Sequence, residues 1–288
     1  MYLIKIFSDF CSSEQCKKNY EKIYQTVSME NYGPNKKVYF TTEDNYTHAI
    51  IINQAMPSNL NIPKENIIGL AFEPYELLRP SPSFIEFAKK NIHKYYIGNK
   101  DNLPEPFVEG FSFMWFADPH RTIEENEKKN IMSIIVSEKR FAPGHQYRHE
   151  LIEKIIERKL PIDIYGRGSL HYKDKYKTNF AKGIFDGEIP YEDYLFSICI
   201  ENFSNSHYFS EKIMSPLMHN CMPIYWGCKN IFHYFKKENI ILLTGNLEFD
   251  MKQLEEILEN PKKFYQYTYT KENQKKINLI ENIDEVFS

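Results

Sequence analysis

The side chains with the most direct chemical use follow one apolar run and open the next helical segment. Residues 194–200 predict a buried strand, and Glu201 and Asn202 come directly after it. Glu211 and Lys212 then stand at the start of a segment with helical spacing. A carboxylate can accept hydrogen bonds from both hydroxyls of a ribose, an ammonium group can neutralise a phosphate, and helix starts at the carboxyl edge of a parallel sheet favour anions. This pattern therefore fits the binding of a nucleotide.

The same residues are also what an ordinary capped helix contains. Ser210 is a fair N-cap, and a glutamate such as Glu211 is favoured in a first turn. On spacing alone, the two interpretations have equal weight.

Other common motifs are absent from the sequence. There is no GxGxxG, no GxxxxGK[ST], no HExxH and no GxSxG, which leaves no dinucleotide fingerprint and no P-loop. His145 and His149 have the i, i+4 spacing of a metal pair but no third ligand nearby, so a solvent-facing helix start is expected instead. Five cysteines without a CxxC pair indicate a reduced protein, in which Cys11 and Cys16 could bridge only if the local geometry allowed it.

Strand and helix patterns alternate in two consecutive series. After the first series, a polar stretch at 118–130 fits a linker or a solvated helix, and the pattern then restarts. This alternation predicts an α/β protein with two Rossmann-like halves and a cleft between them. The expected strands are 2–7, 37–41, 48–53, 66–72, 94–97, 131–137, 162–165, 194–200 and 222–226, and the expected helices are 14–27, 83–90, 147–158, 211–219 and 251–259.

The segment that carries the acids and the lysine resembles the donor-binding motif of family 10 glycosyltransferases, the α1,3/α1,4-fucosyltransferases. The similar residues are Glu201-Asn202, residues 208–212 (Tyr-Phe-Ser-Glu-Lys) and residues 223–227 (Pro-Ile-Tyr-Trp-Gly). Phe209 and Ser210 replace the family's valine and threonine and keep an apolar group and a hydroxyl.

Further similar segments lie upstream in the same order. Residues 141–143 and 147–151 resemble the Pro-x-Arg start of the family's first donor-domain helix, with Arg148 as the arginine that faces the diphosphate. Residues 162–168 resemble its strand that ends in Tyr-Gly, and residues 95–98 resemble a strand of its other half.

The resemblance implies a GT-B-like α/β fold, with two Rossmann-like domains facing a central cleft. Residues 1–125 would bind the acceptor and residues 126–288 the nucleotide sugar. The implied reaction is an inverting, metal-independent transfer, most simply of L-fucose from GDP-fucose to a hydroxyl of a glycan acceptor. The alternatives are a transferase of the same fold that uses another nucleotide sugar, and an inactive glycan-binding protein.

The resemblance also implies roles for individual residues of the donor half. Arg148 and Lys212 would stabilise the diphosphate in place of a metal, so no cofactor is expected. Glu211 would hold the ribose hydroxyls, and Asn202 and Tyr208 would contact the nucleotide.

The catalytic base implied by the resemblance lies in the first half. Residues 71–74 (Ala-Phe-Glu-Pro) stand where the family places its proposed base, which makes Glu73 the candidate. Glu76, three residues further on, is the rival candidate.

Composition sets the remaining expectations. With 36 Lys and Arg against 39 Asp and Glu, the net charge of −3 offers no basic field for nucleic acid. The sequence contains no run of 18 apolar residues and no apolar stretch of the signal-peptide kind, so we expect a cytoplasmic enzyme.

Overall fold

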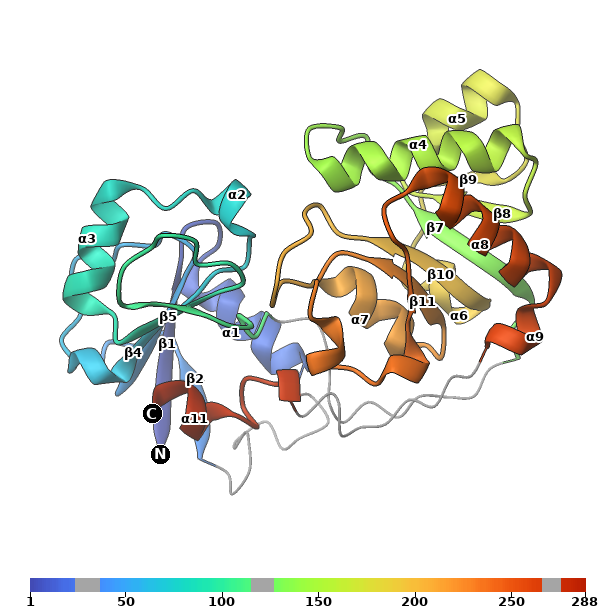
Figure 1. The fold of residues 1–288 in the computed structure, drawn as a ribbon. Helices are drawn as coiled ribbons and strands as arrows, with labels where there is room; N and C mark the ends of the chain where they lie inside the picture. Colours follow the sequence, from blue (N-terminus) through green and yellow to red (C-terminus); the bar gives the residue numbers. More distant parts are fainter. Residues whose placement is uncertain (24–36, 115–126, 266–275) are drawn as a thin grey trace. The chain divides into compact units, whose positions relative to one another are not determined.

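The structure is a computed structural model that describes residues 1–23, 37–114, 127–265 and 276–288. It divides into two compact units, each built on a parallel six-stranded sheet (Figure 1). The first unit comprises Met1–Arg121, Asn205–Tyr208 and Lys271–Ser288, and the second comprises Thr122–Ser204 and Phe209–Thr270. Within the described ranges, no helix is long and apolar enough to cross a membrane.

The sheet of the first unit has the strand order β2-β1-β3-β4-β5-β6, and each neighbouring pair is parallel. Its strands are β1 (Tyr2–Ser8), β2 (Val38–Thr41), β3 (His48–Ile52), β4 (Ile67–Leu70), β5 (Lys94–Ile97) and β6 (Phe107–Glu109).

Helices cover both faces of this sheet, because side chains on a strand alternate between the two faces. On β3, Ile50 and Ile52 pack toward α1 and α11, whereas Ala49 and Ile51 pack toward α2 and α3. The helices are α1 (Ser13–Ile23), α2 (Tyr75–Leu78), α3 (Pro82–Asn91) and α11 (Ile283–Phe287), with a 3-10 turn at Lys64–Asn66.

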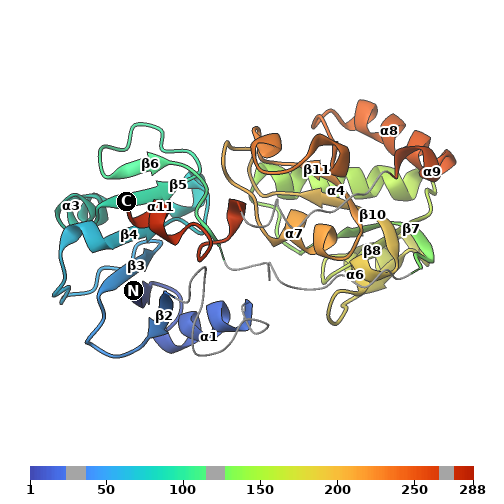
Figure 2. The same ribbon diagram turned by 90° about the horizontal axis from the view of Figure 1, so that it is seen from below.

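The end of the chain completes the first unit, although the sequence analysis assigned all of residues 126–288 to the second domain. Ile280, Ile283 and Val286 are fully buried in the same cluster as the strands β1 to β4. The Tyr2 hydroxyl donates to the Asp284 carboxylate at 2.7 Å, so both ends of the chain lie side by side, as Figure 2 also shows. The assignment of this segment to the donor half was therefore wrong, because its apolar face fills the core of the other unit.

The sheet of the second unit has the order β12-β11-β10-β7-β8-β9, again with parallel neighbours. The strand order reverses between β7 and β10, which is the point where open α/β sheets bind ligands at their carboxyl edge. The strands are β7 (Asn130–Ile135), β8 (Ile162–Tyr165), β9 (Ala181–Gly183), β10 (Tyr194–Ile200), β11 (Met222–Trp226) and β12 (Ile241–Leu242).

Two layers of helices enclose the second sheet. Helices α4 and α8 pack against each other over one face, and the shorter α6 and α7 cover β10 on the other. The helices are α4 (Pro143–Glu157), α5 (Ser169–Tyr176), α6 (Ile189–Glu192), α7 (Glu211–Met218), α8 (Leu247–Glu259) and α9 (Pro261–Phe264), with 3-10 turns at Ile231–His233 and Lys237–Asn239.

The expected α/β alternation is confirmed in both units. Helix α4 begins at Pro143, four residues before the expected start, because proline is pre-organised for the first helical position. Most of the polar stretch at 118–130, and the end of the helix expected at 14–27, lie outside the described residues.

Candidate functional site

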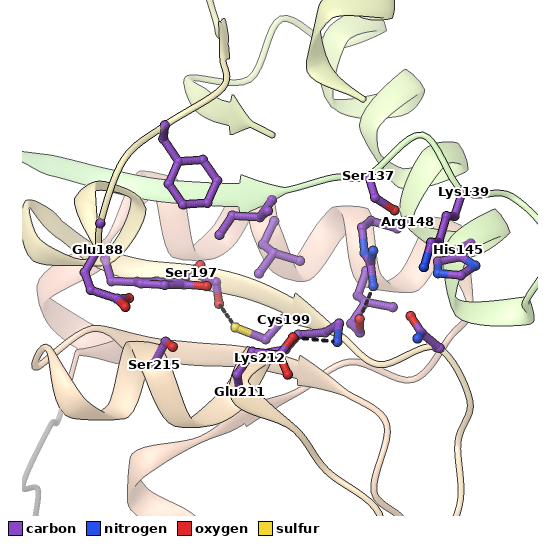
Figure 3. A pocket seen from close by; sticks show the side chains of 17 residues that line it. Ser137, Lys139, His145, Arg148, Glu188, Ser197, Cys199, Glu211, Lys212 and Ser215 are labelled. Carbon is purple, nitrogen blue, oxygen red and sulfur yellow. Dashed lines mark hydrogen bonds and ion pairs between the residues drawn. The ribbon is translucent and has the colours of Figure 1, made fainter. Parts of the chain in front are cut away.

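A pocket of about 420 Å³ opens at the switch point of the second sheet. It is lined by the ends of β7 and β10 and by the first turns of α4 and α7, all within the second unit (Figure 3). Arg148, Glu211, Lys212 and Asn202 all line this pocket, so four of the side chains singled out in the sequence converge on one cavity. The others that line it are Ile135, Ser137, Lys139, His145, Phe185, Gly187, Glu188, Tyr191, Ser197, Ile198, Cys199, Ile200 and Ser215.

Arg148 is a buried cation of the pocket wall. Its side chain is only 5% exposed, and its guanidinium donates to the backbone carbonyl of Ile200 at the end of β10. Burial lowers the pKa of Arg148, while the nearby Glu201 carboxylate acts in the opposite direction. Since the ordinary pKa of arginine lies far above neutrality, the group keeps its charge at the edge of the sheet.

Glu201 joins the end of β10 to the start of α7. Its carboxylate is fully buried and accepts hydrogen bonds from the Ser210 backbone N–H at 2.8 Å and the Ser210 hydroxyl at 2.7 Å. Burial raises the pKa of Glu201, and the Lys212 ammonium, 3.6 Å from the carboxylate, opposes this. Glu201 is therefore a structural acid that places the first turn of α7, beneath the residues that face the pocket.

Lys212 lies between two carboxylates. Its ammonium is 3.0 Å from Glu211 and also donates to the Ser210 hydroxyl at 3.1 Å. Burial disfavours the charge, but Glu201 and Glu211 together raise the pKa of Lys212 above its ordinary value. A permanent cation therefore faces the pocket from the helix start, beside an acid whose side chain is 62% exposed.

The backbone around this helix start is packed too closely for side chains. A Cβ on Gly144 would lie 1.7 Å from the carbonyl oxygen of Glu201, and the Gly144 N–H donates to the Asn202 carbonyl at 3.0 Å. On the other side, a Cβ on Gly227 would lie 2.5 Å from the Cγ of Glu201. The two glycines allow the start of α4 and the end of β11 to pack directly against the loop that follows Glu201. This packing holds the backbone beneath the pocket in place.

His145 is a pocket residue that the sequence analysis did not assign to nucleotide binding. It lies one turn before Arg148 on α4, is 2% exposed, and its Nδ1 accepts the Ala142 backbone N–H at 3.3 Å. Burial, followed by the charges of Arg148, Lys139 and Lys212, lowers the pKa of His145 to about 4. The imidazole is therefore neutral near pH 7 and carries its proton on Nε2, where it can serve as a donor.

The expected solvent-facing helix start at His145 and His149 was wrong, since both side chains are buried. The ring nitrogens of His149 are occupied by the Tyr172 hydroxyl and, at 3.2 Å, the carbonyl of Lys139. Among the described residues, no group of three or more His, Cys, Asp or Glu side chains could hold a metal ion. In the first unit, Cys11 and Cys16 are free thiols with their sulfur atoms 3.0 Å apart.

Tyr208 does not line the pocket. It belongs to the first unit, is 5% exposed, and its Cβ would lie 2.9 Å from a Cβ added to Gly98. Its contact with the nucleotide stays a prediction from the family resemblance.

The two candidate bases follow β4 in the first unit. Glu73 is exposed, in the loop between β4 and α2. Glu76, in α2, accepts a hydrogen bond from the Asn205 amide at 2.8 Å. The loop is anchored where the Asn53 side chain accepts the Phe72 N–H at 2.9 Å. The Asn205 bond gives Glu76 a structural partner within the first unit.

A family model described as glycosyltransferase family 10 (fucosyltransferase), C-terminal part, matches residues 125–285, which is more than half of the chain. The chain belongs to glycosyltransferase family 10. The putative fucosyltransferase R654 of Acanthamoeba polyphaga mimivirus is 36% identical over 53 residues, which are 18% of this chain and 9% of the viral protein. The chain thus spans a small part of the length of this relative.

Solved structures support the fold. An α1,3-fucosyltransferase with GDP-fucose is similar with a TM-score of 0.56 and 12% identity, over 100% of this chain and 90% of that one. The same kind of enzyme with GDP gives a TM-score of 0.55 at 12% identity, over 99% and 91% of the two chains. TarM gives 0.53 at 14% identity, over 83% of this chain and 55% of its own. The fold is GT-B-like, with two parallel-sheet α/β domains.

The buried imidazole predicts a pH-dependent stability. Between about pH 6.5 and pH 4 the unfolded chain binds a proton at residue 145 and the folded protein does not, so the free energy of unfolding falls as the pH falls through this window. In His145→Asn the side-chain oxygen can still accept the Ala142 N–H. The free energy of unfolding of this variant minus that of wild type should therefore be larger at pH 5 than at pH 7. Urea unfolding at both pH values measures this difference.

The exposed His171→Gln variant, on α5, controls for the loss of an imidazole as such. An equal stability difference between His145→Asn and wild type at the two pH values would contradict a neutral, buried His145.

Proposed function

We propose that this protein transfers L-fucose from GDP-fucose to a hydroxyl of a glycan acceptor, with inversion and without a metal ion. The observation that carries the proposal is the convergence of Arg148, Glu211 and Lys212 on one pocket at the switch point of the second sheet. Family membership and the fold shared with α1,3-fucosyltransferases, two of them solved with GDP or GDP-fucose, support the choice of donor.

The pocket offers complementary groups to each part of a nucleoside diphosphate. The exposed Glu211 carboxylate can accept hydrogen bonds from the ribose hydroxyls, and the Asn202 amide offers a further polar contact. Arg148, Lys212 and the neutral donor at His145 lie on neighbouring helix starts, where a diphosphate would gain both charge and hydrogen bonds.

The same groups can stabilise the leaving group. When the bond between the anomeric carbon and the β-phosphate oxygen breaks, negative charge grows on that phosphate. Arg148 is fixed by its bond to the Ile200 carbonyl and Lys212 by its pairs with Glu201 and Glu211, so neither cation must reorganise as the charge develops.

A base on the acceptor side completes the reaction. The acceptor hydroxyl attacks the anomeric carbon from the face opposite the diphosphate, and its proton passes to a carboxylate, for which we propose Glu73. A single displacement of this kind inverts the anomeric centre and needs no covalent glycosyl-enzyme. Glu76, whose carboxylate accepts a hydrogen bond from the Asn205 amide, is the rival candidate.

Removal of the helix-start cation should impair turnover. Lys212→Ala should lower kcat/KM for transfer from GDP-fucose by about 100- to 1000-fold, as the loss of one preorganised charge donor does in other enzymes. GDP release measures the rate, and thermal unfolding reports any loss of stability from the unpaired Glu201.

Lys182→Ala is the matched control, because it removes an exposed lysine of the same unit. The Lys182 ammonium lies 3.1 Å from the Asp163 carboxylate. A folded Lys212→Ala variant with turnover near that of the control would remove Lys212 from the mechanism.

The two candidate bases can be separated by substitution. Glu73→Gln should lower transfer by at least about 100-fold, because general-base catalysis is lost, yet leave the Kd for GDP unchanged, because the pocket belongs to the other unit. Transfer assays combined with calorimetry of GDP binding test both statements. If Glu76→Gln shows the larger loss of transfer, the base is Glu76.

Metal independence is tested directly. Because Arg148 and Lys212 supply the charge that a metal would otherwise supply, transfer should persist in excess EDTA at its untreated rate. A complete loss of activity that Mn²⁺ or Mg²⁺ restores would contradict the proposed mechanism.

A further inference from the structure

The pocket has a second end that differs in chemistry from the cationic one. In Figure 3, Lys139, Arg148 and His145 lie at one end and Glu188 lies at the other, with Glu211 between them. Phe185, Gly187 and Tyr191 also line the pocket, and Figure 3 places Ser197 and Ser215 near the Glu188 end. The cavity thus runs from an acidic, aromatic end to a basic end.

The Glu188 carboxylate faces this cavity and is half-buried. Within the described part of the chain it makes no ion pair and accepts no hydrogen bond, in contrast to Glu201 and Glu211, whose carboxylates pair with Lys212. Its capacity to accept two hydrogen bonds is therefore open toward the cavity.

The backbone that carries Glu188 is held firmly. Its carbonyl accepts the N–H groups of Tyr191 at 2.8 Å and Glu192 at 3.0 Å. The Lys128 ammonium donates to the carbonyls of the same two residues at 3.1 Å and 2.7 Å, and the buried Ser133 hydroxyl donates to the carbonyl of Pro190 at 2.5 Å. These bonds hold helix α6, which Glu188 precedes, against β7 and β10.

The aromatic wall suits a flat ring. Phe185, which lines the cavity, packs edge-on against Tyr165, with 5.8 Å between ring centroids and an interplanar angle of 82°, and this contact restrains its ring. Tyr191 is 8% exposed, and burial raises its pKa well above the ordinary value, so it stays neutral. A planar, polar-edged base can be enclosed here without meeting a second charge.

We propose that Glu188 selects the guanine base, accepting its N1–H and exocyclic N2–H with the two carboxylate oxygens while Phe185 covers the ring. Guanine places two donors side by side on one edge, which matches a carboxylate. Uracil presents one donor between two carbonyl oxygens, and adenine presents an unprotonated nitrogen, so both would meet the carboxylate with a lone pair. The order Glu188, Glu211, then Arg148 with Lys212 follows the order of base, ribose and diphosphate. This assignment rests on the proposed function and extends it to the selection of the nucleotide.

The experiment compares GDP with inosine diphosphate, which lacks only the exocyclic amino group. Calorimetry on the full chain should show that the wild type binds GDP about tenfold more tightly than inosine diphosphate, since a hydrogen bond to a charged group contributes about 1.5 kcal/mol or more. In Glu188→Gln the ratio of the two Kd values should fall toward one, with a loss of GDP affinity of about 10- to 100-fold. Glu192→Gln, which removes an exposed carboxylate from the helix that follows Glu188, should keep the wild-type ratio.

Two results would overturn the assignment. An unchanged ratio of GDP to inosine diphosphate affinity in Glu188→Gln would remove Glu188 from base selection but leave the proposed function intact. A wild type that binds UDP more tightly than GDP, or binds neither, would overturn the proposed donor together with this assignment. The ratio of the two Kd values is taken within each variant. A fraction of unfolded protein lowers the measured binding of both ligands equally, so it does not change this ratio.

Discussion

The pocket of the second unit depends on one buried carboxylate, that of Glu201. A fully buried acid is costly unless its oxygens are bonded, and here the backbone and hydroxyl of Ser210 satisfy them while Lys212 offsets the charge. These bonds determine where α7 begins. Glu211 and Lys212 are the first residues of that helix. The buried Glu201, which lies behind the cavity, therefore determines where the charges of these two residues face it.

The cationic wall is built from side chains that are held before any ligand arrives. Arg148 is bonded to the end of β10, Lys212 lies between two acids, and His145 is fixed through its Nδ1 to the backbone that precedes α4. A rigid arrangement of donors loses little conformational entropy when a diphosphate binds. Burial also keeps water away from Arg148, which strengthens its interaction with the charge of a phosphate.

Much of this architecture could be read from the sequence, and the failures have physical reasons. The strands were predictable because parallel strands buried on both faces are continuous apolar runs, as in Tyr194–Ile200. Glu201, Glu211 and Lys212 were found through their position after such a strand. The burial of His145 was missed, because it follows from the close approach of Gly144 to the Glu201 loop and from no periodic pattern along α4.

The acidic end of the pocket was missed for a related reason. Glu188 and its neighbours lie between the short strand β9 and the four-residue helix α6, where no run is long enough to show a period. Their place beside β10 results from bonds made by Lys128 and Ser133, which are distant in sequence. Likewise, the apolar residues near the C-terminus gave no indication of which of the two cores they would join.

The return of these last residues to the first unit has a consequence for biosynthesis. The core that surrounds β1 to β4 includes Ile280, Ile283 and Val286 from the end of the sequence. The second unit is instead continuous in sequence from Thr122 to Thr270, except for residues 205–208. On the ribosome, the second unit can therefore collapse while the first still lacks part of its interior. Until residues 280–286 are synthesised, the first unit therefore lacks the apolar side chains that complete the core beside α1.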